Sequence, residues 1–243
     1  LALKARHPES RILLAGCLSQ RYPEALAADL PEADGIFGNA DLSRVTEAAE
    51  ALASGARPVL VPEAAPLARA PRKRLYNFPR SAYVKITEGC SNHCAFCAIP
   101  LIRGEARSRA PSDVAEEVRG LIAAGNFEIN LIGQDLGAYG MDTLAHRALP
   151  ELLAELGRID EDFRVRMLYI HPDHFPEGLL DECARDPRML PYFDLPFQHA
   201  SAPILRAMNR AGDAETYLAL MDRIRDRLPD AVLRSTFLVG FPG

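Results

Sequence analysis

Short apolar runs alternate with amphipathic segments along most of the chain. After residue 82 we expect buried strands over 83–87, 128–132, 164–170, 192–195 and 232–239, because each run is short and rich in apolar residues. Between them, apolar residues at helical spacing predict helices over 112–124, 149–156, 176–184, 202–208 and 214–228. No antiparallel hairpin signal separates these runs. The alternation therefore predicts parallel strands joined by helices.

Right-handed crossovers would curl five such strands into a parallel (β/α) barrel or part of one. Polar residues and glycines collect where the strands end. Gly133, Gln134 and Asp135 follow the second strand, and Gln198 and His199 follow the fourth. In a barrel these carboxyl ends form the active-site face. Each residue taken singly could be an ordinary turn residue, but their shared face favours a binding site.

The first 57 residues predict a second, smaller α/β unit. The apolar run 11–15 ends at Gly16 and Cys17, the run 35–38 is a second short strand, and helices are expected from Pro23 and over 42–53. This order fits a small doubly wound sheet. Cys17 then lies at the carboxyl end of a strand, where such sheets bind ligands. A free cysteine in a turn is also often simply buried.

Residues 58–81 predict an extended linker, which divides the chain into segments 1–57, 58–81 and 82–243. Prolines interrupt any regular element there, and the second half is basic. A solvated charged linker is the commoner interpretation, and contact with RNA or a ribosome is the alternative.

Composition narrows the class of protein. Of 243 residues, 48% are hydrophobic, which is enough for a full core, and the formal net charge of −5 argues against a strong general attraction to nucleic acid. Five cysteines without a pairing pattern suit a reducing compartment. No run reaches transmembrane length and no signal peptide is visible. We therefore expect a cytoplasmic protein without membrane contact, and a fragment lacking both termini, because the chain starts at Leu1 inside a helix-like segment.

The strongest chemical signal is a cysteine triplet directly after the first strand of the larger unit. Cys90, Cys94 and Cys97 have C-x3-C-x2-C spacing. Three thiolates on one loop can hold three irons of a 4Fe–4S cluster and leave the fourth iron open. A zinc site would need a fourth ligand, and His93 is too close to Cys94 to supply it easily. Three thiols cannot all pair as disulfides. Cys183, on a predicted helix, is expected in the core.

Three arginines, Arg103, Arg107 and Arg109, follow this loop. Their guanidinium groups could bind a substrate carboxylate in forked geometry, or they could pair with nearby acids on the surface. The sequence leaves both interpretations open. The turn 171–174 has site potential without a specific role.

The cysteine spacing closely resembles the signature of the radical S-adenosylmethionine (SAM) superfamily. The resemblance implies that Cys90, Cys94 and Cys97 are the catalytic and metal-binding residues. In that superfamily SAM chelates the open iron, and one electron from the cluster cleaves SAM to a radical that abstracts hydrogen. Candidate SAM-binding residues are the strand-end residues Gly133, Gln134, Asp135 and Gln198, together with Gly240 in the closing stretch.

Further stretches resemble the methylthiotransferase family within this superfamily: 16–23, 88–104, 133–135, 139–140, 190–201 and 237–243. The resemblance implies two 4Fe–4S clusters, and Cys17 matches the last of three cysteines that hold the auxiliary one. It also implies that SAM serves as methyl donor and as radical source. The patterns at 98–104, 133–135 and 168–173 are most similar to the branch that adds a methylthio group to the β-carbon of an aspartate in small-subunit ribosomal protein S-twelve.

The implied partners are that ribosomal protein or the small ribosomal subunit, and an electron donor such as flavodoxin or ferredoxin. The alternative substrate is adenosine in tRNA. A base target would favour stacking aromatics and a basic channel, whereas this chain has no Trp, few aromatics and a negative charge. An inactive fragment that only binds an iron–sulfur cluster is the third interpretation.

Overall fold

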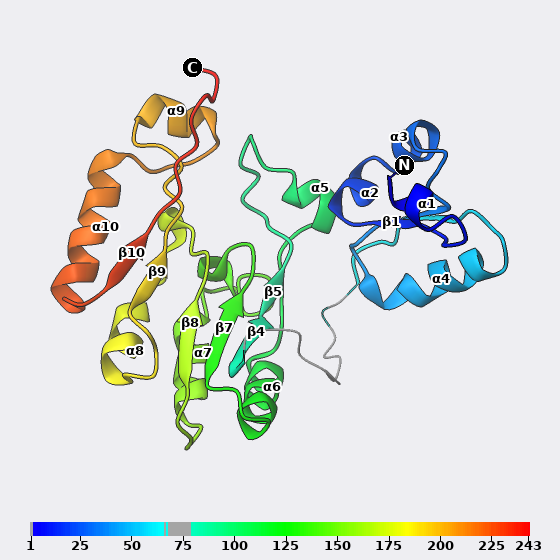
Figure 1. Cartoon of the computed structure of the whole chain (residues 1–243). Helices are drawn as coiled ribbons and strands as arrows, with labels where there is room; N and C mark the ends of the chain where they lie inside the picture. Colours follow the sequence, from blue (N-terminus) through cyan, green and yellow to red (C-terminus); the bar gives the residue numbers. More distant parts are fainter. Residues whose placement is uncertain (1, 66, 68–78) are drawn as a thin grey trace. The chain divides into compact units, whose positions relative to one another are not determined.

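The computed structural model describes residues 2–65, 67 and 79–243 (Figure 1). The chain divides into two compact units. The first comprises Leu1–Pro66 with Ala98–Gly104, and the second comprises Leu67–Cys97 with Glu105–Gly243. The predicted boundary at residue 57 was too early, because the next residues complete the sheet of the first unit. Half of the expected linker, residues 66 and 68–78, lies outside the described residues.

The first unit contains a small parallel sheet. Strands β1 (Leu13–Ala15), β2 (Gly35–Phe37) and β3 (Val59–Leu60) pair in the order β1-β2-β3. Around them lie α1 (Ala2–Arg6), α2 (Cys17–Arg21), α3 (Pro23–Asp29), the 3-10 turn η1 (Leu42–Arg44), α4 (Val45–Ala53) and α5 (Ile99–Arg103). The predicted α/β character is confirmed. The described strands follow chain order, so the reversal that defines a doubly wound sheet is not seen among them.

Local sequence explains the ends of these helices. Pro23 occupies the first turn of α3, where its missing N–H costs nothing. The Asp41 carboxylate caps η1 by accepting from the Ser43 amide, so the helix predicted over 42–53 opens with a 3-10 turn and continues as α4 from Val45. At the end of α3, the Arg57 guanidinium donates to the carbonyls of Ala27 and Leu30.

The second unit is part of a parallel (β/α) barrel, as predicted. Strands β4 (Ser81–Lys85), β7 (Glu128–Ile132) and β8 (Arg164–Met167) pair in parallel, and β9 (Tyr192–Asp194) pairs in parallel with β10 (Val232–Arg234). The Ile170 amide donates to the Asp194 carbonyl at 2.9 Å, which connects the two sheets at the end of β8. In Figure 1 the strands follow one another side by side from β4 to β10. A short antiparallel pair, β5 (Thr87–Glu88) with β6 (Arg107–Ser108), was not predicted.

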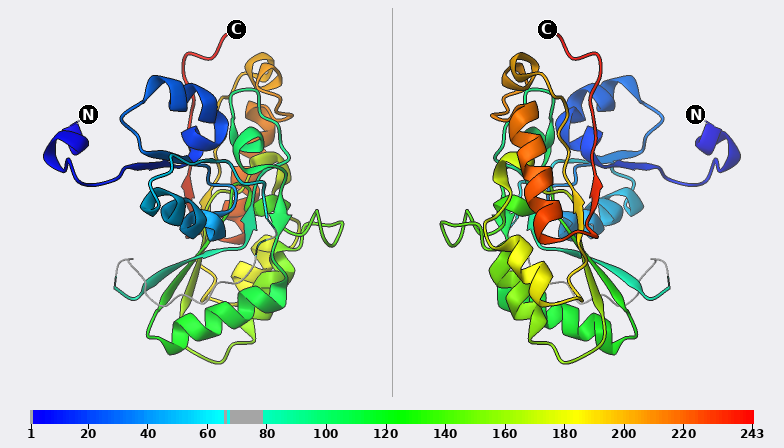
Figure 2. Two further views of the ribbon diagram at one scale, coloured as in Figure 1. Left: turned by 90° about the vertical axis from the view of Figure 1, so that its right-hand side faces the viewer. Right: turned by 90° about the vertical axis from the view of Figure 1, so that its left-hand side faces the viewer.

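Helices α6 (Pro111–Ala123), α7 (Leu149–Gly157), α8 (Leu179–Arg185) and α10 (Ala214–Arg227) pack against one another along one face of these strands. Figure 2 shows α6, α8 and α10 on that side. Between helices and strands lies the core, in which Val118, Leu153, Val165, Phe193 and Ile224 have almost no exposed surface. Cys183 of α8 belongs to this core, as expected, and burial raises the pKa of its thiol to about 12.

One predicted helix start was wrong, and another was one residue late. Helix α6 begins at Pro111 after the uncapped Ala110, one residue before the predicted start, because proline is preorganised for the first helical position. Helix α8 begins at Leu179 rather than Pro176, since Gly178 has left-handed backbone geometry (φ +80°) and interrupts the helix before it.

The remaining short elements connect strand ends to helices: η2 (Leu136–Ala138), η3 (Pro172–His174) and α9 (Ala202–Ala207). None of the helices in the described part of the chain has the length and apolar character needed to cross a bilayer.

Candidate functional site

The cysteine loop, defined as residues 89–97, leaves the carboxyl end of β5. Gly89 turns the chain with φ +79°, and His93 also has a positive φ of 50°. The Ala95 amide donates to the Met208 carbonyl at 3.0 Å, and Nδ2 of Asn209 donates to the His93 carbonyl at 3.1 Å. The end of α9 and the turn after it therefore hold the loop in place.

The three thiols of the loop are half-buried, and none is in a disulfide. Burial raises the pKa of the Cys90 thiol to about 11, and the nearby carboxylate and thiols add to this effect. Burial also raises the pKa of Cys94, although the positive charge of Arg210 opposes the shift. Because only thiolates bind metal, a cluster must displace these protons when it binds.

Within the part of the chain that the structure describes, no group of three or more His, Cys, Asp or Glu side chains lies in an arrangement that could hold a metal ion. The cluster site therefore stays a prediction. The donor chemistry fits it, since three unpaired thiols on one loop after a strand match the ligand set of a 4Fe–4S cluster with one open iron.

A cavity of about 260 Å³ lies beside this loop. The loop residues Gly89, Cys90, Ser91 and Asn92 line one part of it. The rest of the lining comes from Ala106, directly before β6, and from the segment after β7: Asp135, Ala138, Met141 and Asp142. The cavity is near the lower end of the usual size range of small-molecule sites. It lies at the strand ends where the sequence predicts the cofactor.

Asp135 lies at the edge of this cavity and is 5% exposed. Its Oδ1 accepts from the amides of Gly137 (2.9 Å) and His171 (3.0 Å), and its Oδ2 accepts from Nδ2 of Asn92 (2.9 Å) and Nδ1 of His174 (2.9 Å). Burial would raise the pKa of Asp135, but these hydrogen bonds together hold it below its usual value. Because internal donors occupy both oxygens, the structure does not support the predicted SAM contact for Asp135.

Gln134 does not line this cavity, but it has an unused hydrogen-bond acceptor. Its Nε2 lies 3.4 Å from Oε1 of Glu88, and its buried Oε1 has no hydrogen-bond donor among the described residues. A buried acceptor without a donor is rare and fits a ligand that brings one, such as an ammonium group. Gly133, next to it, has a packing role: a methyl group there would overlap the Thr87 side chain.

Of the residues predicted to bind SAM, Asp135 lines the cavity beside Cys90, whereas Gln198 and Gly240, like Gly133 and Gln134, do not. Gln198 has a positive φ of 68°, and its backbone bonds to Thr236 and Leu238. These bonds extend the pairing of β9 with β10 beyond their ends. Gly240 is exposed, with φ +79° and open space around its Cα. Their SAM contacts remain predictions from the resemblance.

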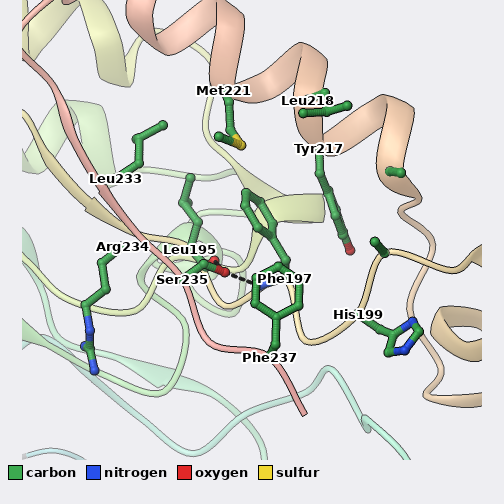
Figure 3. A pocket seen from close by; sticks show the side chains of 12 residues that line it. Leu195, Phe197, His199, Tyr217, Leu218, Met221, Leu233, Arg234, Ser235 and Phe237 are labelled. Atoms are coloured by element: carbon green, nitrogen blue, oxygen red, sulfur yellow. Dashed lines mark hydrogen bonds between the residues drawn. The ribbon is translucent and has the colours of Figure 1, made fainter. Parts of the chain in front are cut away.

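A second, apolar cavity of about 320 Å³ lies between α10 and the β9–β10 pair (Figure 3). Phe197 stacks on Tyr217 with ring centroids 4.7 Å apart, and Phe237 lies 6.4 Å from Phe197. Figure 3 shows His199 and Arg234 on opposite sides of this aromatic group. Of the residues expected at the fourth strand end, only His199 lines this cavity.

The arginine set does not act as one group. Arg109 is 7% exposed, pairs with Glu117 at 2.5 Å and donates to the Lys85 carbonyl, so it has a structural role. Arg103 belongs to α5 in the first unit, whereas Arg107 belongs to β6 in the second. Of the two open interpretations, forked substrate binding fails for Arg109, because its guanidinium is committed to Glu117 and the Lys85 carbonyl.

Sequence reasoning missed several buried polar residues of the second unit. Arg210 is 5% exposed and donates from Nε to Nε2 of His171 at 2.9 Å. Asp194, on β9, has no exposed surface, and its Oδ2 accepts from Nη1 of Arg234 at 2.6 Å. Asn92 was visible inside the cysteine loop and could have been singled out. No local pattern pointed to Arg210 or Asp194.

Cys17 lies in the first unit, at the first residue of α2 and directly after β1. The predicted position after a strand is confirmed. Its exposed sulfur accepts a hydrogen bond from Nδ2 of Asn39 at 3.2 Å. Hydrogen bonds of this kind tune cysteines that bind clusters.

Comparison with known proteins bears on these observations. A curated relative from Treponema denticola, named ribosomal protein uS12 methylthiotransferase RimO, is 45% identical over 100% of this chain and 57% of its own length. A relative of the same name from Thermotoga maritima is 40% identical over 96% of this chain and 53% of its own length. The chain thus spans about half the length of the curated relatives it matches.

Solved structures show the fold. The radical SAM methyltransferase TsrM from Kitasatospora setae matches 97% of this chain and 51% of its own with a TM-score of 0.69 at 17% identity. The radical SAM enzyme OxsB matches 97% of this chain and 38% of its own with a TM-score of 0.66 at 13% identity.

The family model of the radical SAM superfamily matches residues 84–243, well over half of the chain. The matched region begins within β4 and contains the cysteine loop and every later strand of the partial barrel. On this match, and on the cysteine spacing, the chain belongs to the radical SAM superfamily.

Proposed function

We propose that this protein adds a methylthio group to the β-carbon of an aspartate in ribosomal protein uS12, using SAM both as methyl donor and as radical source. The observation that carries the proposal is the identity of 39–45% to curated relatives of that name, over 96–100% of this chain. Identity at this level extends through both units, so it includes the segment around Cys17 as well as the cysteine loop.

In this proposal Cys90, Cys94 and Cys97 hold the radical SAM cluster, and Cys17 is one ligand of a second cluster. When bound, the radical SAM cluster would supply the electron that cleaves SAM, and the second cluster would carry the sulfur that receives the methyl group. The chain itself binds and orients. Gln134 would accept a hydrogen bond from the amino group of SAM, because its buried Oε1 has no donor among the described residues.

The cavity beside the cysteine loop would also exclude water from the reacting groups. Ala138 and Met141 form an apolar part of its lining. A radical that abstracts hydrogen must be protected from side reactions, so an apolar lining next to the cluster site suits the chemistry. The proposed partners are ribosomal protein uS12 or the small subunit, and a reductant such as flavodoxin or ferredoxin.

The test uses the full-length enzyme, reconstituted anaerobically with iron, sulfide, SAM and a reductant. We would offer it ribosomal protein uS12 and tRNA together and search both for the mass of a methylthio group. A methylthio mass increase on the aspartate peptide alone supports the proposal. If only tRNA adenosine gains this mass, the proposed substrate is wrong and the methylthiotransferase chemistry is retained.

A matched pair of variants tests the cluster assignment in the same experiment. Cys94→Ala should abolish SAM cleavage, because it removes a cluster ligand. Cys183→Ala makes the same chemical change in the buried core of α8 and should leave iron content and SAM cleavage in place. Equal activity in the two variants would contradict the assignment of the cysteine loop.

A further inference from the structure

One buried carboxylate connects three loops at the carboxyl ends of the strands. The four donors to Asp135 come from Asn92 in the cysteine loop, from Gly137 after β7, and from His171 and His174 after β8. These loops are separate in sequence. Their common partner therefore sets how the cysteine loop lies relative to the neighbouring strand ends.

The hydrogen-bonding capacity of this carboxylate is fully used. An ionised carboxylate accepts about four hydrogen bonds, and Asp135 receives two at each oxygen, all between 2.9 and 3.0 Å. Hydrogen bonds to a charged acceptor are stronger than those between neutral groups. No lone pair is left for a cofactor, so a role through the cysteine loop accounts for this residue better than direct SAM binding.

Asn92 is the point at which the loop is held from two sides. Its side chain donates to Asp135, while its own carbonyl accepts from Nδ2 of Asn209 at 3.4 Å. The same Asn209 amide reaches the His93 carbonyl, and the Ala95 amide bonds to Met208. Since Asn92 lies two residues from both Cys90 and Cys94, fixing Asn92 restricts where both thiols can lie.

A second layer fixes Asp135 itself. The His174 ring that donates to Asp135 stacks on His171, with ring centroids 4.6 Å apart. Arg210 donates to His171 from the other side and also to the carbonyl of Pro196. These residues are largely buried, so the carboxylate has little freedom to move. Rigid support of this kind is what a precise ligand loop requires.

We propose that Asp135 is a positioning residue of the cysteine loop, acting through Asn92 to place Cys90 and Cys94 before the cluster binds. The inference rests on the proposed function only in taking these cysteines as cluster ligands. An asparagine at position 135 would be nearly isosteric but would present an NH₂ group to two of the four donors. The loop would then lose its side-chain tether, although the fold around it keeps its apolar core.

The first test needs no cluster. Hydrogen exchange of the backbone amides over 91–97 would be followed in the metal-free chain for the wild type, Asn92→Ala and Asp135→Asn. We expect exchange in this segment to become about tenfold faster in both variants, because each loses the same charged hydrogen bond. In the double variant the effect on the loop should be no larger than in Asn92→Ala alone.

The control is Asp186→Asn. The Asp186 carboxylate, at the end of α8, forms an ion pair with Arg188 and accepts from the Arg188 amide, and it does not contact the cysteine loop. This variant should leave exchange over 91–97 unchanged. If Asp135→Asn does not fold, Asn92→Ala decides the question, because Asn92 is a partly exposed loop residue. Wild-type exchange rates in Asn92→Ala would overturn the proposal.

The second test uses the reconstituted protein. In Asp135→Asn and Asn92→Ala we expect a heterogeneous electron paramagnetic resonance spectrum of the reduced cluster, and SAM cleavage about tenfold slower, with kcat affected more than KM. If the wild type itself binds no cluster, the proposed function fails, while the exchange result still stands or falls independently. A uniform wild-type spectrum in both variants would contradict the positioning role.

Discussion

Gly133, at the end of β7, packs directly against the side chain of Thr87 in β5. A methyl group on Gly133 would overlap Cγ2 of Thr87 and lie 3.1 Å from Cδ2 of Leu136. The missing side chain lets the strand end approach the segment that leads into the cysteine loop. Gly133 was predicted as a cofactor contact, and this close packing gives it a structural reason as well.

Gly133→Ala should therefore destabilise the chain by about 1–3 kcal/mol, the usual cost of overpacking a core position. Chemical denaturation measures this. Adding Thr87→Ser should recover most of the loss, because serine lacks the overlapping methyl group and keeps the hydroxyl that bonds to the Arg107 carbonyl. Gly120→Ala in the interior of α6 is the control: nothing lies near its Cα, so it should stabilise by roughly 0.5–1 kcal/mol. If Gly133→Ala loses stability and the added Thr87→Ser does not restore it, the packing explanation is wrong.

His171 should make stability depend on mildly acidic pH. Burial and the neighbouring Arg210 lower its pKa from 6.5 to about 4. Between these values the unfolded state binds more protons than the folded state, so stability falls as the pH is lowered through this range. We expect the free energy of unfolding to fall by roughly 1–3 kcal/mol over this pH range. In His171→Asn the free energy of unfolding should depend much less steeply on pH.

The comparison for this prediction is His146→Asn. His146 is exposed, and its bonds to the Leu144 carbonyl and Glu151 raise its pKa, which is a shift of opposite sign. Its replacement should leave the acid slope in place. An identical slope in wild type and His171→Asn, measured by denaturation at several pH values, would show that His171 does not titrate as described.

The raised pKa of Cys90 predicts slow alkylation in the metal-free chain. At neutral pH its thiol is almost entirely protonated, and reaction requires the thiolate. The rate for Cys90 should rise about tenfold per pH unit from pH 7 to 9, since its pKa lies near 11. Mass spectrometry of the Cys90 peptide after iodoacetamide treatment measures the rate of alkylation. Reconstitution with iron and sulfide should protect the Cys90 thiol from alkylation. Rapid, pH-independent alkylation would contradict the buried environment of this thiol.

The Asp194–Arg234 pair should be sensitive to removal of the cation alone. Asp194 is fully buried and burial raises its pKa, although Arg234 opposes the shift. Arg234→Gln should lower the free energy of unfolding by roughly 1–3 kcal/mol. This is at most the usual loss when one partner of a buried ion pair is removed, because the Arg234 side chain is half-exposed. The variant should be relatively more stable at pH 5 than at pH 7.5, since a raised pKa favours the protonated acid there.

Combining Arg234→Gln with Asp194→Asn should recover part of this stability, because the remaining amides are neutral. Calorimetry or denaturation of the four proteins gives the coupling between the two positions. Additive losses, with no recovery in the double variant, would mean that the two side chains do not depend on each other.

Much of the fold followed from local pattern. The strand predicted over 128–132 is β7 with the same bounds, and the helices over 149–156 and 214–228 differ by one residue from α7 and α10. Such segments are long enough for their periodicity to report which face is buried. The sequence missed β3 and the β5–β6 pair, because each strand has only two residues and carries no period.

The sequence by itself determined the donor chemistry of the site, since the three cysteines of the loop are close in the chain and their spacing is the signal. Only the tertiary structure decided what surrounds them. The partners of Asp135 in Asn92, His171 and His174 lie 43, 36 and 39 residues away in sequence. The physical reason is that parallel strands separated by helices bring their carboxyl ends to one face, so residues meet there by topology, and no local pattern records the meeting.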